Sequence, residues 1–162
     1  MKYISFERFK KEILKSELSP ERTAASMAAG VWLAFSPFPG LHLLTAFLVA
    51  RFMRLNGVVL LAGVLIHNPW SMILIHMTGL VVGDLLLTGS IASLEQFELF
   101  PWGELGFTTI FSAGFWSVNA PLLKTFIKPF FVGSLLVAST GSALSYRITL
   151  RFLKRVKGDN QP

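Results

Sequence analysis

Two long stretches of this sequence contain almost no charged residues, and this limits the folds that the chain can adopt. Between residues 23 and 83 the only fully charged side chains are Arg51 and Arg54, and residues 129–146 contain none. Of the 162 residues, 52% are hydrophobic and only 15% are charged, whereas a soluble domain usually has ~25% charged residues. Long stretches without charge are typical of helices in a lipid bilayer, where an ionised side chain is costly. We therefore expect an all-α membrane protein built as a short helical bundle.

The basic residues predict how the chain faces the membrane. Most of the 15 Lys and Arg residues cluster near the two ends of the chain, whereas residues 88–123 contain none and hold Glu95, Glu98 and Glu104. Because Lys and Arg are enriched on the cytoplasmic side of membrane proteins, we expect both termini to be cytoplasmic and residues 88–123 to form an outer loop.

Prolines divide the apolar region into short helices. Ser19-Pro20 and Asn68-Pro69 each place an N-cap residue before a proline, which is a signal for the start of a helix. The prolines between Ser36 and Gly40 end one helix, and Asn56-Gly57 ends another. The expected helices span residues 20–35, 41–55, 58–66, 69–87 and 125–156, all within a single membrane domain over residues 19–157.

Helix length predicts which segments cross the bilayer. A spanning helix needs about 20 residues, so the segments 41–55 and 58–66 are too short, whereas 69–87 and the C-terminal helix are long enough. We therefore expect a proline-broken, re-entrant helix pair that turns at Ser36–Gly40 and returns Arg51 and Arg54 to the cytoplasmic interface. A plain hairpin that spans twice through residues 20–55 is the alternative.

The two ends of the chain are expected to lie outside the bundle. Phe6, Phe9 and Ile13 share one face of a predicted helix in residues 1–18, which would lie on the cytoplasmic leaflet. A solvated helix with a Glu7–Lys11 pair explains the same pattern. Residues 158–162 are polar and are expected to form a disordered tail.

The sequence shows no signature of catalysis. It has no cysteine, which excludes disulfides and thiolate chemistry, and it has no nucleophile elbow, phosphate-binding glycine loop or zinc-protease motif. His42, His67, His76 and Asp84 lack the spacing of a recognised metal site. We expect neither an enzyme nor a bound cofactor or metal. Nucleic acid is not an expected partner, because the basic residues flank membrane segments.

Several short motifs in the first half of the chain resemble a known family. They are Ser19-Pro20, Gly30-Val31, Ser36-Pro37-Phe38-x-Gly40-Leu41-His42, Arg54-Leu55-Asn56, Gly63 and Asn68-Pro69 with Ser71 soon after. Together they resemble a bacterial integral-membrane family known as domain of unknown function 2062. Ala34 and the apolar residues 72–75 depart from its usual pattern. The resemblance implies a small multi-pass protein of the bacterial inner membrane and implies no activity.

The two proline breaks together predict a binding site. Helix starts near Gly40/Leu41 and Asn68/Pro69 would present unpaired N–H groups and positive dipole ends at membrane depth, an arrangement that suits an anion. The residues expected to line the site are Ser36, Pro37, Gly40, His42, His67, Asn68 and Pro69. Arg51 and Arg54 would attract a lipid headgroup from the cytoplasmic leaflet. The alternative is that both breaks only bend helices so that they pack.

These features favour a transporter or flippase-like protein that handles an anionic, lipid-linked envelope substrate. Asp84 is the one acid in the apolar region, and it is expected either to couple transport to protons or to reach the interface as a snorkelling carboxylate. Anionic lipid headgroups are the expected partners, together with a second copy or another membrane protein at small-residue faces. A scaffold or assembly factor, and a membrane-embedded enzyme using histidine and Asp84, are the rival hypotheses.

Overall fold

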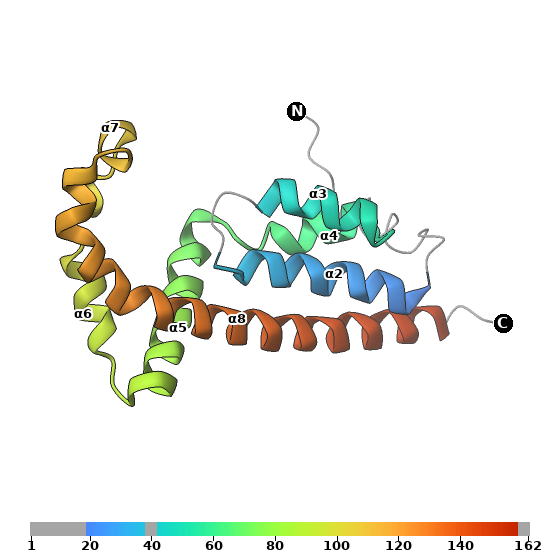
Figure 1. Ribbon diagram of the computed structural model, residues 1–162. Helices are drawn as coiled ribbons and strands as arrows, with labels where there is room; N and C mark the ends of the chain where they lie inside the picture. The colour runs from blue at the N-terminus through green and yellow to red at the C-terminus, as the bar shows by residue number, and fades with distance from the viewer. Residues whose placement is uncertain (1–18, 38–41, 159–162) are drawn as a thin grey trace. The chain divides into compact units, whose positions relative to one another are not determined.

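The computed structural model describes residues 19–37 and 42–158. All regular structure in these ranges is helical, which confirms the predicted all-α class (Figure 1). The elements are α2 (Pro20–Phe35), α3 (His42–Phe52), α4 (Gly57–Val64), α5 (Pro69–Thr88), α6 (Ala92–Leu99), the 3-10 turn η1 (Trp102–Glu104), α7 (Phe107–Ile110) and α8 (Ala113–Gly158). The amphipathic helix predicted in residues 1–18 and the last four residues lie outside the described part of the chain.

Two helices are long and apolar enough to cross a membrane. They are α5, over Trp70–Thr88, and α8, within Ala113–Val156. The second includes the predicted C-terminal spanning helix. Helix α3 is apolar but has only 11 residues, so it is about 16 Å long and shorter than the hydrocarbon core.

The described residues form two compact units. The first consists of residues 19–37, 42–68 and 138–158, and the second of residues 69–137. The boundaries fall at Asn68-Pro69, the predicted second break, and inside α8. Each unit therefore has its own packing.

In the first unit, α2 and α4 run in the same direction. Ser26 on α2 accepts a hydrogen bond from the backbone N–H of Asn56 at 2.9 Å, and one turn further along, Gly30 packs against Leu60 and Gly63 of α4. Helix α3 returns the chain between them. Consequently the C-terminal ends of α2 and α4, where the two helix breaks occur, lie at the same end of this unit.

Side chains next to the helix ends determine where α2 and α4 begin. The Ser19 hydroxyl accepts a hydrogen bond from the Arg22 N–H at 3.3 Å, and Pro20 is the first helical residue. The Asn56 side chain accepts bonds from the N–H groups of Val58 and Val59 at 3.1 and 3.2 Å. A side-chain acceptor at this position satisfies N–H groups that have no partner within the helix.

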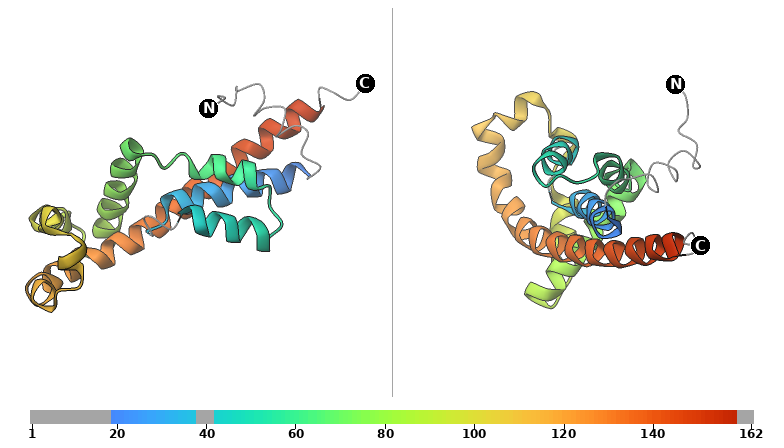
Figure 2. Two further views of the ribbon diagram at one scale, coloured as in Figure 1. Left: turned by 90° about the horizontal axis from the view of Figure 1, so that it is seen from above. Right: turned by 90° about the vertical axis from the view of Figure 1, so that its right-hand side faces the viewer.

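The C-terminal part of α8 runs antiparallel to α2 (Figure 2). The Ser142 hydroxyl donates to the Ala28 carbonyl at 2.9 Å. Nearer the C-terminus, Lys154 forms an exposed ion pair with Glu21 at 3.1 Å. The start of α2 and the end of α8 therefore lie together, at the end of the unit opposite the two helix breaks.

The second unit has a glycine-mediated helix contact. Gly79 and Gly83 of α5 pack on α8 so closely that a Cβ atom at Gly83 would overlap the Pro129 carbonyl, and one at Gly133 would overlap the Gly79 carbonyl. Small residues at a helix interface allow such close backbone approach.

The segment 88–123, which is predicted to lie on the outer side of the membrane, is largely helical. It contains α6, η1, α7 and the first turns of α8, which begins at Ala113 and not near residue 125. The physical reason is an aromatic cluster: Leu80, Phe100 and Phe126 are buried together, with Phe97, Phe115 and Trp116 packed against them. Burying this large apolar area offsets the entropy of ordering the segment.

Two prolines lie inside α8, at positions 121 and 129. A proline within a helix removes the hydrogen bond to the carbonyl four residues earlier. For Pro129 that carbonyl belongs to Thr125, and the Ser93 hydroxyl lies 3.5 Å from it. The predicted helix over residues 125–156 already included Pro129, and both α5 and α6 contact α8 at this proline.

Candidate functional site

The two helix breaks, after α2 and after α4, are in contact through a pair of histidines. His42 is the first residue of α3, and His67 follows α4, just before Asn68. Their ring centroids lie 4.5 Å apart, with an angle of 36° between the ring planes. The parallel course of α2 and α4 explains this meeting, because it brings the start of α3 and the end of α4 to the same end of the unit.

The neighbouring residues also lie together. Phe35 and Ile66, which immediately precede Ser36 and His67, line one shallow hollow of about 320 Å³. Ser36 ends α2 in an extended conformation (φ −68°, ψ 151°), and its hydroxyl donates to the Leu33 carbonyl at 2.8 Å. Pro37 explains this helix end, because a residue before proline is disfavoured in the helical region.

His42 is the most unusual member of the pair. Its side chain is only 7% exposed, and within the described ranges its Nε2 atom is buried with no hydrogen-bond partner. Burial, and then the neighbouring His67, hold the pKa of His42 below its ordinary value of 6.5. Burial also lowers the pKa of His67. Both histidines lie outside the two long apolar helices, and near pH 7 they are neutral.

A buried nitrogen without a partner costs free energy. Polar groups inside proteins nearly always have hydrogen-bond partners, and leaving one unsatisfied costs about 1–3 kcal/mol. An anion would supply the missing partner, because it accepts a hydrogen bond from imidazole and favours its protonated form. Helix α3 begins at His42, so the positive end of its dipole faces the same place.

The structure brings some of the predicted residues together and separates others. His42 and His67 are in contact, and Ser36 and Pro37 are buried at the end of α2. Asn68 is exposed, and Pro69 begins α5. Gly40 lies outside the described residues.

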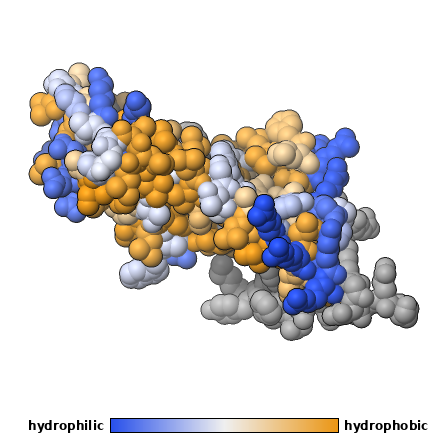
Figure 3. All heavy atoms as spheres, turned by 90° about the horizontal axis from the view of Figure 1, so that it is seen from below, coloured by the Kyte–Doolittle hydropathy of each residue, from blue (hydrophilic) through white to orange (hydrophobic). Residues whose placement is uncertain are grey.

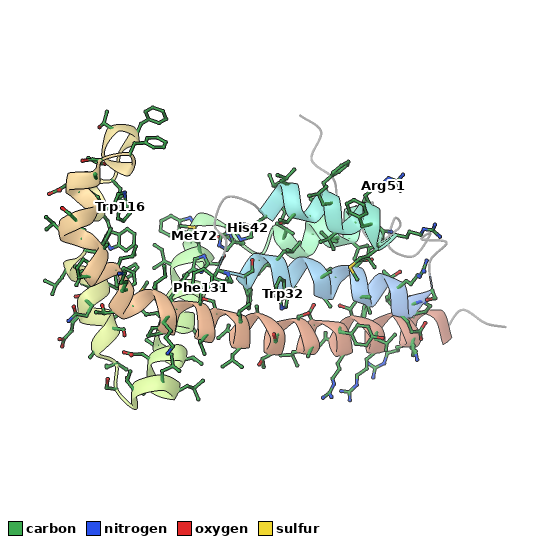
Figure 4. The ribbon with its side chains drawn as sticks, in the orientation of Figure 1. Trp32, His42, Arg51, Met72, Trp116 and Phe131 are labelled. Carbon is green, nitrogen blue, oxygen red and sulfur yellow. The ribbon has the colours of Figure 1, made fainter. Side chains whose placement is uncertain are left out.

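Arg51 and Arg54 are not at the histidine pair. Both are exposed at the C-terminal end of α3, and Figure 4 shows His42 and Arg51 at opposite ends of that helix. Arg54 has a positive φ of 52°, in the turn that leads to Asn56. Arg22, Arg151, Lys154 and Arg155 lie at this same end of the unit, next to the Glu21–Lys154 contact. The first unit therefore has a histidine end and a basic end.

Asp84 has a structural environment of its own in the second unit. It is 1% exposed, which contradicts the prediction of a snorkelling carboxylate. Its oxygens accept hydrogen bonds from the Ser93 N–H at 2.7 Å, the Ser93 hydroxyl at 2.8 Å and the Thr88 hydroxyl at 3.1 Å. Asp84 thus caps the first turn of α6. The sequence signal for this role is the pair of hydroxyl residues Thr88 and Ser93, four and nine positions after Asp84, which the prediction did not consider.

The described residues contain no group of three or more His, Cys, Asp or Glu side chains arranged to hold a metal ion. Burial lowers the pKa of both His42 and His67, so the pair consists of two neutral imidazoles near pH 7. Such a pair can donate and accept hydrogen bonds and can take up a proton when an anion arrives.

The fold and the site together define a class: an all-helical protein with two helices long enough to span a membrane, and with a buried histidine pair where two helix breaks meet. The chain belongs to the family described as "Uncharacterized protein conserved in bacteria (DUF2062)", whose model matches residues 5–161. No curated protein and no solved structure matches the chain.

Proposed function

We propose that this protein is a transporter or flippase-like protein of the bacterial inner membrane that handles an anionic envelope substrate bearing a phosphate or carboxylate group. The observation that carries the proposal is the contact of His42 with His67, with the buried Nε2 of His42 left without a partner among the described residues. The anionic group of the substrate would bind there.

The exposed surface of the first unit supports a membrane setting. On α3, Leu43, Leu44, Phe47 and Phe52 are each more than 60% exposed, and Leu65 beyond α4 is 71% exposed. Water-soluble monomers rarely expose so much contiguous apolar surface. Lipid would cover these side chains, although α3 and α4 are too short to cross the bilayer.

The basic end gives the proposed orientation. Arg22, Arg51 and Arg54 would lie at the cytoplasmic interface, in keeping with the positive-inside rule. Helix α2 has 16 residues and is therefore about 24 Å long. The histidine pair at its far end would lie deep within the ~30 Å hydrocarbon core. In this arrangement α2 and α3 form a re-entrant pair and both termini are cytoplasmic.

A buried histidine pair favours substrate handling over the two rival hypotheses. A scaffold needs exposed contact surfaces and gains nothing from a buried imidazole that costs stability. The enzyme hypothesis needs an acid that is free to act beside a histidine, but the Asp84 carboxylate is engaged by Ser93 and Thr88. A binding site within a path across the membrane uses both the burial and the polarity of the pair.

The direct test is lipid movement in reconstituted vesicles. In vesicles with a fluorescent phosphatidylglycerol analogue, we expect the wild-type protein to make inner-leaflet label accessible to external dithionite. Replacing both His42 and His67 by glutamine should reduce that rate to the level of empty vesicles. His76→Gln, a histidine of the second unit, is the matched control and should retain the wild-type rate. If the wild-type rate equals that of empty vesicles, or the double variant is fully active, the proposal fails.

Substrate binding at His42 should also depend on pH. Burial lowers the pKa of free His42, and a bound anion would raise it, so binding takes up a proton. Affinity should therefore increase as the pH falls from 8 towards 5.5, by up to about tenfold per pH unit. Titrating detergent-solubilised protein with dihexanoyl phosphatidylglycerol would measure this, since the charge of that phosphodiester is constant over the range. His67 is the titratable group that faces His42.

The control for the pH experiment is His42→Gln, which retains hydrogen bonding but cannot take up the proton. Its affinity should change little with pH. A wild-type affinity that stays constant between pH 8 and 5.5 would show that His42 does not bind the anion.

A further inference from the structure

An apolar groove of about 710 Å³ lies in the first unit between α2 and α8, with α3 forming one side. Its lining includes Ala25, Ala29 and Trp32 of α2, and Ser139, Ala143 and Arg147 of α8. Figure 4 shows Trp32 between these two helices. The volume is in the range of sites that hold small organic ligands.

The groove exists because the facing stripes consist mainly of small residues. On each helix the lining positions recur at intervals of three or four residues, so they share one face. Ala28 and Ser142 lie at the contact itself, where the Ser142 hydroxyl donates to the Ala28 carbonyl at 2.9 Å. This bond holds the two backbones together while the short side chains beside it leave space.

The length of the groove suits one leaflet of a bilayer. From Ser139 to Arg147 the lining face of α8 rises about 12 Å. The hydrocarbon of one leaflet is roughly 15 Å deep, half of the ~30 Å core. A single hydrocarbon chain that follows the groove would therefore begin near the membrane interface and end within the apolar region.

One end of the groove is basic. Arg147 lines it, and Arg151, Lys154 and Arg155 follow on α8, all exposed. Figure 3 shows hydrophilic side chains gathered at this end of α8, beside a largely apolar surface. Among the described residues of the first unit the only acid is Glu21, which pairs with Lys154. The groove therefore combines an apolar floor with an excess of positive charge at its mouth.

We propose that this groove is a binding site for an anionic phospholipid, with one hydrocarbon chain along the Ala25–Ala143 floor and the phosphate on Arg147. Charge complementarity favours this occupant over an apolar helix of a second protein, which would leave the guanidinium of Arg147 without a counter-charge. The site is separate from His42 and His67 at the other end of the unit. The proposal requires that the protein lies in a membrane, but it does not depend on the proposed transport function.

The test measures which lipid occupies the groove. A variant with Trp70, Trp102 and Trp116 replaced by phenylalanine keeps Trp32 as its single tryptophan, and it would be placed in vesicles of phosphatidylcholine and phosphatidylglycerol. Brominated phosphatidylglycerol should quench Trp32 with an affinity about three- to tenfold higher than brominated phosphatidylcholine, since one charge-assisted contact adds selectivity of that order.

Two further variants localise the effect. Arg147→Gln should remove the preference for phosphatidylglycerol, whereas Arg151→Gln, one turn along α8 and outside the groove lining, should keep it. Ala143→Leu fills the groove from an exposed position and should weaken quenching by both lipids. Equal quenching of Trp32 by the two lipids, or the same preference in Arg147→Gln, would overturn the proposal and leave only a general lipid layer.

A second measurement avoids the tryptophan replacements. Native mass spectrometry of the full chain released from the same vesicles should show phosphatidylglycerol retained on the wild-type protein and on Arg151→Gln. It should be depleted severalfold on Arg147→Gln. Equal retention by all three proteins would contradict the assignment of Arg147.

Discussion

Replacing Gly30 by alanine should strongly destabilise the first unit. A Cβ atom at Gly30 would overlap the Leu60 carbonyl oxygen and lie 2.9 Å from the Gly63 Cα. Both obstacles are backbone atoms, so no change of rotamer relieves them, and α2 must separate from α4. Overpacking usually costs about 1–3 kcal/mol, and we expect a value at the upper end. Circular dichroism during heating in detergent would show the loss as a lower melting temperature.

The matched control for Gly30 is another glycine of the same helix pair. A Cβ atom at Gly57, in the first turn of α4, would meet only the Ala50 Cβ at 3.9 Å, an ordinary contact. Gly57→Ala should therefore melt at or above the wild-type temperature, because alanine favours a helix more than glycine does. If Gly30→Ala melts like the wild type, α2 and α4 do not cross at Gly30 and Gly63.

Replacing Asp84 by alanine should have the second large effect. The carboxylate accepts three hydrogen bonds, two from Ser93 and one from Thr88, and it is almost completely buried. Its loss leaves the Ser93 N–H without an acceptor at the start of α6. A charge-assisted hydrogen bond stabilises a fold by about 1–3 kcal/mol, and a buried unsatisfied donor destabilises it by a similar amount. We therefore expect the free energy of unfolding to fall by about 3 kcal/mol. Thermal unfolding followed by near-ultraviolet circular dichroism would report it through the aromatic cluster.

Asp84→Asn separates a capping role from proton coupling. Asparagine retains an oxygen that can accept the Ser93 N–H, and its amide can donate to the Ser93 hydroxyl. We therefore expect Asp84→Asn to recover much of the stability lost in Asp84→Ala and to keep the lipid-transfer rate. A stable Asp84→Asn protein without transfer would instead show that Asp84 exchanges protons during transport.

The predicted binding site was partly recoverable from sequence. The prolines at Ser36–Gly40 and Asn68-Pro69 marked where helices break, because the missing N–H and the fixed φ act locally. That the two breaks meet depends on α2 and α4 running in the same direction, which rests on Gly30 and Gly63 fitting against each other. Arg51 and Arg54 were assigned to the site, but the 11 residues of α3 separate them from His42.

Asp84 shows why a single residue is hard to interpret without tertiary contacts. In the sequence it is an isolated acid near the end of an apolar helix, where the helix dipole disfavours negative charge. The chain then turns back, and Ser93, nine residues later, supplies two hydrogen-bond donors. The same turn lets Phe97 and Phe100 reach Phe126, and these contacts lie between α6 and α8 in a segment that is largely helical.

The sequence by itself determined the helical class, the two helices long enough to span a membrane, the positions of the breaks, and membership of a bacterial family. These properties follow from hydropathy, charge and backbone stereochemistry, which act over a few residues. Only the tertiary structure decided that His42 meets His67, that the arginines gather at the opposite end, that Asp84 caps α6, and that a groove lies between α2 and α8. Each of these depends on contacts between segments that are far apart in the chain. Local sequence patterns do not specify which distant segments come into contact.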